Sequence, residues 1–150
     1  MTVDAQRARA YRFRPHVVEV ERAQLVDFAD ATGQTDPVYL DVDAARAAGH
    51  PDLPVPPTFF YCLELGAPDA LSHLSDLGVD LARLVHGEQA FRFHAPAHAG
   101  DRLALHTRIA DVYEKAGGRL QLLVRETSFM REEALVAQST TTLVLTGADA

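Results

Sequence analysis

The stretch GHPDLPVPPTFFYCLELG, residues 49–66, decides the fold. Its first half is rich in proline and favours an extended chain, whereas residues 59–65 form an almost wholly apolar run. Thr58 is placed to cap a helix that ends before Gly66. Because a helix that is apolar on every side is normally buried, we expect this helix at the centre of the core, with Cys62 as a small core residue.

The pattern of hydrophobic residues changes to a period of two near residue 85. Strands are expected over residues 85–94, 102–114, 119–130 and 134–145, after a first strand near 16–20. Reversals at 115–118 and 131–133 predict an antiparallel meander. A buried helix followed by a curved antiparallel sheet indicates the α+β class. We expect a single hot dog fold, with about five antiparallel strands wrapped around the central apolar helix; a generic α+β sandwich is the alternative.

Shorter helices are expected in the first half of the chain. Helical spacing of apolar residues predicts one helix over residues 23–33, a second one begins after Asp41, and a third, on the surface, covers 68–77. A length of 150 residues suits one domain, so we expect a single domain over residues 1–150 with its core over about 17–145.

Composition excludes several classes of function. The net charge is −7 and the basic residues are scattered, so no nucleic-acid partner is expected. A single cysteine forms no internal disulfide and fits a reducing compartment. No apolar leader or membrane span is seen, which predicts a cytoplasmic location. The histidines lack the spacing of metal ligands, so neither a metal nor another cofactor is expected; His94, His98 and His106 are expected to face solvent.

The stretch ATGQTDPVYLDVDAA, residues 31–45, is predicted to hold a helix end, a polar turn and a new helix start. With it, FADATGQTDPVYLDVDAARAAG, VPPTFF, LVHGEQAFRFHAP and AGDRLALHTRIADV follow in order along the chain. Over residues 17–145 the chain resembles MaoC-like hydratases/dehydratases. It resembles most the type of domain found as the N-terminal half, or as the companion subunit, of double hot dog enzymes.

The resemblance implies where catalytic groups would stand. In catalytic members the turn reads roughly G-D-x-N-P-L-H, and its Asp and His form the working dyad. Here Gln34 occupies the Asp position and Tyr39 the His position. A Tyr with an ordinary pKa near ~10 is a poor base at pH 7, and a Gln amide does not titrate. Losing such proton transfer costs ~10²–10⁴-fold in rate. We therefore expect Gln34, Asp36 and Tyr39 to line a substrate pocket, with Asp36 first of all a turn former.

Other residues are candidates for chemistry or binding. The stretch from His50 to Glu64 is similar to the pattern of β-hydroxyacyl-ACP dehydratases, in which such a His and Glu are catalytic; the alternative is that both side chains simply face solvent. Pro57, Thr58 and Phe59 at the start of the central helix are expected to meet the acyl thioester. His86 is a further candidate to bind the substrate; the alternative is that it has only a structural role.

Three hypotheses about function remain open. The chain is a substrate-binding subunit of an enoyl-CoA hydratase/3-hydroxyacyl dehydratase, paired with a dyad-bearing hot dog chain; or a self-sufficient hydratase using His50 and Glu64; or a hot dog acyl-CoA thioesterase using Glu64. In each case the ligand is an acyl-CoA or acyl-ACP thioester, and the chain is expected to form a heteromer or a homo-oligomer. Arg92, Arg102 and Arg125 are candidates to meet a CoA phosphate.

Overall fold

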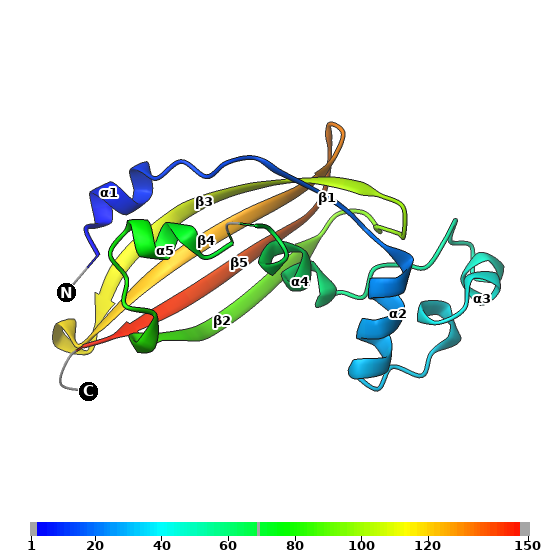
Figure 1. Ribbon diagram of the computed structural model, residues 1–150, viewed down its shortest axis with the longest axis horizontal. Helices are drawn as coiled ribbons and strands as arrows, with labels where there is room; N and C mark the ends of the chain where they lie inside the picture. The colour runs from blue at the N-terminus through cyan, green and yellow to red at the C-terminus, as the bar shows by residue number, and fades with distance from the viewer. Residues whose placement is uncertain (1–2, 69, 148–150) are drawn as a thin grey trace.

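A five-stranded antiparallel sheet curves around one short helix in the computed structural model, which describes residues 3–68 and 70–147 (Figure 1). The strands are β1 (His16–Glu19), β2 (Leu84–Phe93), β3 (Arg102–Lys115), β4 (Leu120–Arg131) and β5 (Ala134–Thr146). The helix α4 (Phe59–Leu65) lies against the concave face, as the sequence predicts. This arrangement confirms the α+β hot dog fold.

The order of the strands differs from a simple meander. It is β1-β3-β4-β5-β2, so β3, β4 and β5 follow one another through tight reversals, but β2 pairs with β5 at the far edge. The loop between β2 and β3 explains the difference. It is held to the proline-rich segment by an isolated bridge between Pro54 and His98 and by bonds between Val55 N and Ala97 O (2.8 Å) and Ala99 N and Leu53 O (2.9 Å). The chain is thereby carried away from β2, and a hairpin does not form.

The helices outside the sheet gather at two ends of the molecule. One end holds α2 (Arg22–Ala31), the 3₁₀ turn η1 (Pro37–Tyr39) and α3 (Val42–Ala47) (Figure 1). The other end holds α1 (Ala5–Ala10), α5 (Ser72–Asp76) and the turns η2 (Leu81–Arg83) and η3 (Ala116–Gly118). The expected helices at 23–33 and after Asp41 are confirmed, and Asp41 caps α3 by accepting from Ala44 N at 2.8 Å.

One prediction about helices is wrong, and one helix was missed. The expected surface helix over 68–77 is only five residues long, and its His73 and Leu74 are fully buried because they pack beneath the N-terminal segment. The helix α1 was not predicted at all. Its sequence carries no apolar period; it is fixed instead by the Asp4 cap and by the Gln121 amide, which accepts from and donates to the backbone of Val3.

The core is divided by a row of polar side chains on the concave face. One apolar cluster surrounds α4 and includes Leu105, Phe129 and Ala137, and a second lies under α1 and α5. Between them, consecutive strands place polar residues in register. We call this set the polar belt: Thr107 on β3, Arg125 and Thr127 on β4, and Ser139 and Thr141 on β5. Of these, all but Thr107 are at least nine-tenths buried.

Candidate functional site

Three side chains of the polar belt converge on Glu64, the carboxylate of the central helix. Arg125 Nη2 donates to Glu64 Oε2 at 3.0 Å and Thr127 Oγ1 donates to the same oxygen at 3.1 Å. Ser139 Oγ donates to Glu64 Oε1. The hydroxyls of Thr107 and Thr127 are 3.0 Å apart, which extends the network to β3. Three of the roughly four acceptor positions of this carboxylate are therefore taken.

Glu64 and Arg125 form a buried ion pair. Their side chains are 4% and 5% exposed, in contrast to the exposed pair of Arg108 and Glu126 on the same sheet. The interpretation that Glu64 simply points into solvent is therefore wrong: α4 turns it onto the sheet, and its neighbour Leu65 is exposed instead. Arg125 is likewise buried and does not reach the surface, where a CoA phosphate would bind.

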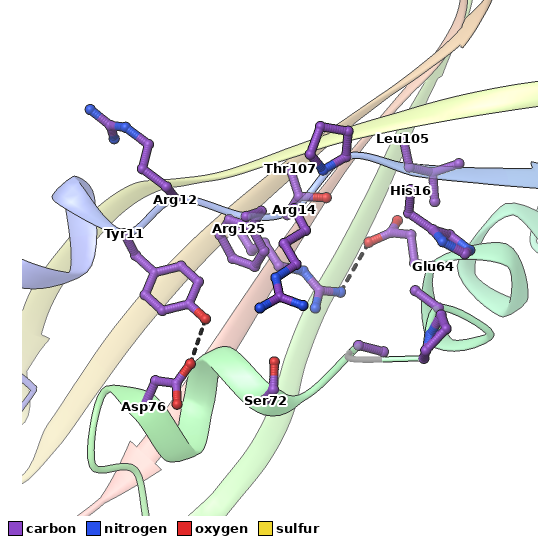
Figure 2. Close-up of a pocket in the computed structure, with 15 residues that line it drawn as sticks. Tyr11, Arg12, Arg14, His16, Glu64, Ser72, Asp76, Leu105, Thr107 and Arg125 are labelled. Carbon is purple, nitrogen blue, oxygen red and sulfur yellow. Dashed lines mark hydrogen bonds and ion pairs between the residues drawn. The ribbon is translucent and has the colours of Figure 1, made fainter.

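A cavity of about 440 Å³ opens beside this network. Its walls are the strap formed by residues 11–16, the end of α4, the α4–α5 connection and the polar belt (Figure 2). Because α4 ends at Leu65 after two turns, the chain leaves the concave face there and space remains between the strap and the sheet. The size lies within the range of small-molecule sites, ~300–1,000 Å³. Both apolar and charged side chains line it.

His73 is an unusual buried group beside this end of the sheet. It is fully buried and packs against Phe13, with ring centroids 4.9 Å apart. Neither ring nitrogen has a hydrogen-bonding partner among the described residues. Burial, and secondarily the positive charge of Arg125, lowers the pKa of His73 to about 4. Its ring is consequently neutral near pH 7 and behaves as a packing group.

The loop at residues 33–41 lies at the opposite end of the domain, beside α2 and α3 (Figure 1). Gln34 Oε1 accepts from the backbone N–H groups of Thr35 and Asp36, both at 3.0 Å. Asp36 Oδ1 accepts from Val38 N at 3.0 Å and caps η1. Tyr39 is partly buried in that turn. The acceptor oxygens of both polar side chains thus hold the loop itself.

His50 and Glu64 have separate partners. His50 Nδ1 lies 3.1 Å from His98 Nε2, so one ring donates a hydrogen bond to the other, and burial lowers the pKa of His98. Among residues 3–68 and 70–147 no hydrogen bond or ion pair joins His50 to Glu64. The expectation that His98 faces solvent is wrong, because it is buried against the proline-rich segment; His94 and His106 are exposed as expected.

The start of α4 differs in detail from the expectation. Thr58 stands at the N-cap position but its side chain makes no capping bond, because its backbone is already helical. The N–H of Phe59 donates to Pro56 O at 2.9 Å, so this donor is engaged within the chain. Phe59 is buried against Phe28, whereas Pro57 is exposed. The stretch therefore presents no free Phe59 donor to a thioester carbonyl.

One side of α4 and the edge strand β2 are open to solvent. Cys62 is exposed rather than a core residue, and Leu65, Val85 and Phe93 are 43%, 54% and 46% exposed. His86 is exposed on β2, and its ring stacks on Tyr61 with centroids 5.0 Å apart. The exposed apolar groups lie beside the unpaired edge of β2. We call this surface the α4–β2 face; it combines exposed apolar side chains with the unpaired edge of a sheet, which is a feature of surfaces that bind another chain.

Within the described part of the chain, no group of three or more His, Cys, Asp or Glu is arranged to hold a metal ion. No helix there has the length and apolar character needed to span a membrane.

These features define a hot dog domain of the dehydratase type, with a polar cavity beside its central helix. A family model described as "FAS1-like, dehydratase domain region" matches residues 7–139, and the chain belongs to this family of MaoC-like hot dog proteins. A UPF0336 protein of Saccharopolyspora erythraea is 40% identical over 129 residues, covering 86% of this chain and 82% of that protein.

Solved structures share the fold. A chain of the HadBC (3R-hydroxyacyl-ACP dehydratase) complex from Mycobacterium tuberculosis has a TM-score of 0.76 and 28% identity, over 89% of this chain and 96% of that chain. A MaoC-like dehydratase from Phytophthora capsici has a TM-score of 0.81 at 18% identity, over 97% of this chain but 51% of that one. The chain thus matches a whole subunit in the first case and half of a longer chain in the second.

Proposed function

We propose that the chain is the substrate-binding subunit of an enoyl-thioester hydratase/3-hydroxyacyl-thioester dehydratase, paired with a hot dog chain that carries the catalytic dyad. The observation that supports this proposal is which residues the loop at 33–41 contains and how they are hydrogen-bonded. Hydration needs a group that takes a proton from water and one that delivers a proton to the α-carbon. The resemblance assigns the two positions to Gln34 and Tyr39, and the Gln34 acceptor is bound to the loop backbone.

The α4–β2 face supports a partner of the same fold. An edge strand with exposed apolar neighbours is a template for extending the sheet with a second chain, and Leu65, Val85 and Phe93 would be covered by it. The similar HadBC chain comes from a complex of two subunits. In such a pair the partner would supply proton transfer, and this chain would hold the acyl group of a CoA or carrier-protein thioester in the cavity beside Glu64.

Coexpression with a candidate companion that carries G-D-x-N-P-L-H tests the proposal. A one-to-one complex by light scattering, and hydration of trans-2-enoyl-CoA by that complex, are expected. Val85→Asp should abolish the complex, because it puts a charge on the α4–β2 face. Val17→Asp is the matched control, since Val17 is 52% exposed on β1 at the opposite edge of the sheet. Equal loss in both variants, or no complex at all, would contradict the pairing.

A further inference from the structure

The cavity beside Glu64 holds two arginine side chains although the chain as a whole is acidic. The protein carries 21 acidic and 14 basic residues. The guanidinium groups of Arg14 and Arg125 nevertheless lie together in the cavity, near the carboxylates Glu64 and Asp76, whereas the Arg12 side chain points away from it (Figure 2). A wall of this kind attracts an anion, because a partly enclosed site strengthens the interaction of charges within it.

Arg125 has hydrogen-bonding capacity that the chain does not use. Its side chain is 95% buried, and Nη2 donates to Glu64, but Nε has no partner among the described residues although it is inaccessible. Buried donors in native proteins are nearly always hydrogen-bonded. A buried donor that stays unbonded on a charged group costs free energy. An acceptor that enters the cavity and displaces the surrounding side chains slightly would meet this donor.

Arg14 adds a second cation at the mouth. It is exposed, and no ion pair or hydrogen bond of its side chain is found within residues 3–68 and 70–147. In Figure 2 its guanidinium, like that of Arg125, lies in the space between the strap and α5. The two groups come from different elements and line one cavity, so a single ligand can contact both.

Both carboxylates of the wall accept hydrogen bonds from neighbouring side chains. Glu64 accepts from Arg125, Thr127 and Ser139, and Asp76 Oδ2 accepts from Tyr11 Oη at 2.6 Å. Arg125 Nε and the Arg14 guanidinium, in contrast, have no bonded acceptor within residues 3–68 and 70–147, so a ligand that brings an acceptor fits them. Planar guanidinium groups favour carboxylate, which they bind through paired N–H groups. Apolar wall residues, Phe13, Pro68 and Leu105, leave room for a short aliphatic chain.

We infer that this cavity binds the carboxylate end of a short aliphatic ligand, with Arg14 and Arg125 as its cationic contacts. Combined with the proposed function, on which this step rests, the inference names the substrate class: thioesters of dicarboxylic acids, in which the distal carboxylate enters the cavity. Simple fatty acyl groups leave both arginines without an acceptor and bind more weakly.

Binding of free acids tests the cavity independently of any thioester. Titration of the ¹⁵N-labelled chain with hexanoate and with hexanamide, at fixed ionic strength, compares a carboxylate with its neutral isostere. We expect hexanoate to bind at least tenfold more tightly. Arg14→Gln should remove that preference, and Arg108→Gln, an exposed arginine elsewhere on the sheet, should leave it unchanged. The double variant Glu64→Gln, Arg125→Gln keeps the buried pair neutral and should also lose the preference.

Binding of CoA thioesters distinguishes a failure of this inference from a failure of the proposed function. Adipyl-CoA is expected to bind at least tenfold more tightly than hexanoyl-CoA. Equal binding of these thioesters and equal binding of hexanoate and hexanamide would overturn the carboxylate site and leave the proposed function standing. A preference for hexanoate with no binding of either thioester would instead refute the proposed function and keep the site. Equal loss of the preference in Arg14→Gln and Arg108→Gln would also overturn the site.

Discussion

Replacement of Arg125 by Met tests whether the Glu64 network is a structural centre of the domain. The substitution keeps the length of the side chain but removes the cation from a carboxylate that is 4% exposed. Removing one partner of a buried ion pair costs about 3–5 kcal/mol, because the other charge stays buried. Since Thr127 and Ser139 still donate to Glu64, we expect the lower end, about 3 kcal/mol. In a 150-residue domain this lowers Tm by about 6–12 °C.

Urea unfolding followed by circular dichroism measures the change. Arg108→Met is the control: the Arg108–Glu126 distance of 2.6 Å is shorter than the 3.0 Å of the buried pair, but the side chains are 70% and 41% exposed. That variant should lose at most about 1 kcal/mol. Adding Glu64→Gln to Arg125→Met should recover at least about 1 kcal/mol, because the uncompensated charge is gone. Equal losses for Arg125→Met and Arg108→Met would refute the reasoning.

Three further results are expected. Because the folded pKa of His73, about 4, lies below the unfolded value of ~6.5, the unfolded state takes up the proton first, and stability falls as pH drops from 6.5 towards 4. The loss from this group should reach about 2 kcal/mol by pH 5 and disappear in His73→Phe; an identical pH profile in the variant would contradict it. Cys62 should react with a thiol reagent in the folded chain, and faster at higher pH because burial of part of the side chain raises its pKa; reaction only in denaturant would exclude an exposed thiol. Gln34→Ala should cost about 1 kcal/mol in urea unfolding, because it removes the acceptor for two backbone N–H groups, and a cost within error of zero would show that the turn does not depend on it.

Local patterns predicted the elements of the fold well. The apolar run at 59–65 gave the bounds of α4, and alternation located all five strands to within two residues. The position of β2 could not be predicted in this way, because it depends on contacts between the β2–β3 loop and the proline-rich segment far away in the sequence. The exposed side of α4 was missed for a related reason: composition shows that a helix is apolar but not how much of it one chain covers.

The candidate site was predicted only in part. Glu64 stands out as the lone charge on an apolar helix, but its partners come from two strands, β4 and β5, and their convergence depends on register. The sequence of β4 did allow a prediction. Arg125 lies on the same face of the strand as Leu123, Thr127 and Phe129, all of which are buried. An arginine at an inward position indicates a buried charge that needs a partner. Arg14 carries no comparable signal, because only the path of the strap places it at the cavity.

We propose that this chain binds acyl thioesters and leaves proton transfer to a partner. Incubation of the purified chain alone with a panel of trans-2-enoyl-CoA thioesters, including one with a distal carboxylate, tests it most directly when hydration and free CoA are both measured. We predict binding without turnover, and hydration only after a dyad-bearing hot dog chain is added. Hydration by the chain alone would contradict the claim in favour of catalysis by His50 and Glu64, and release of CoA would contradict it in favour of a thioesterase.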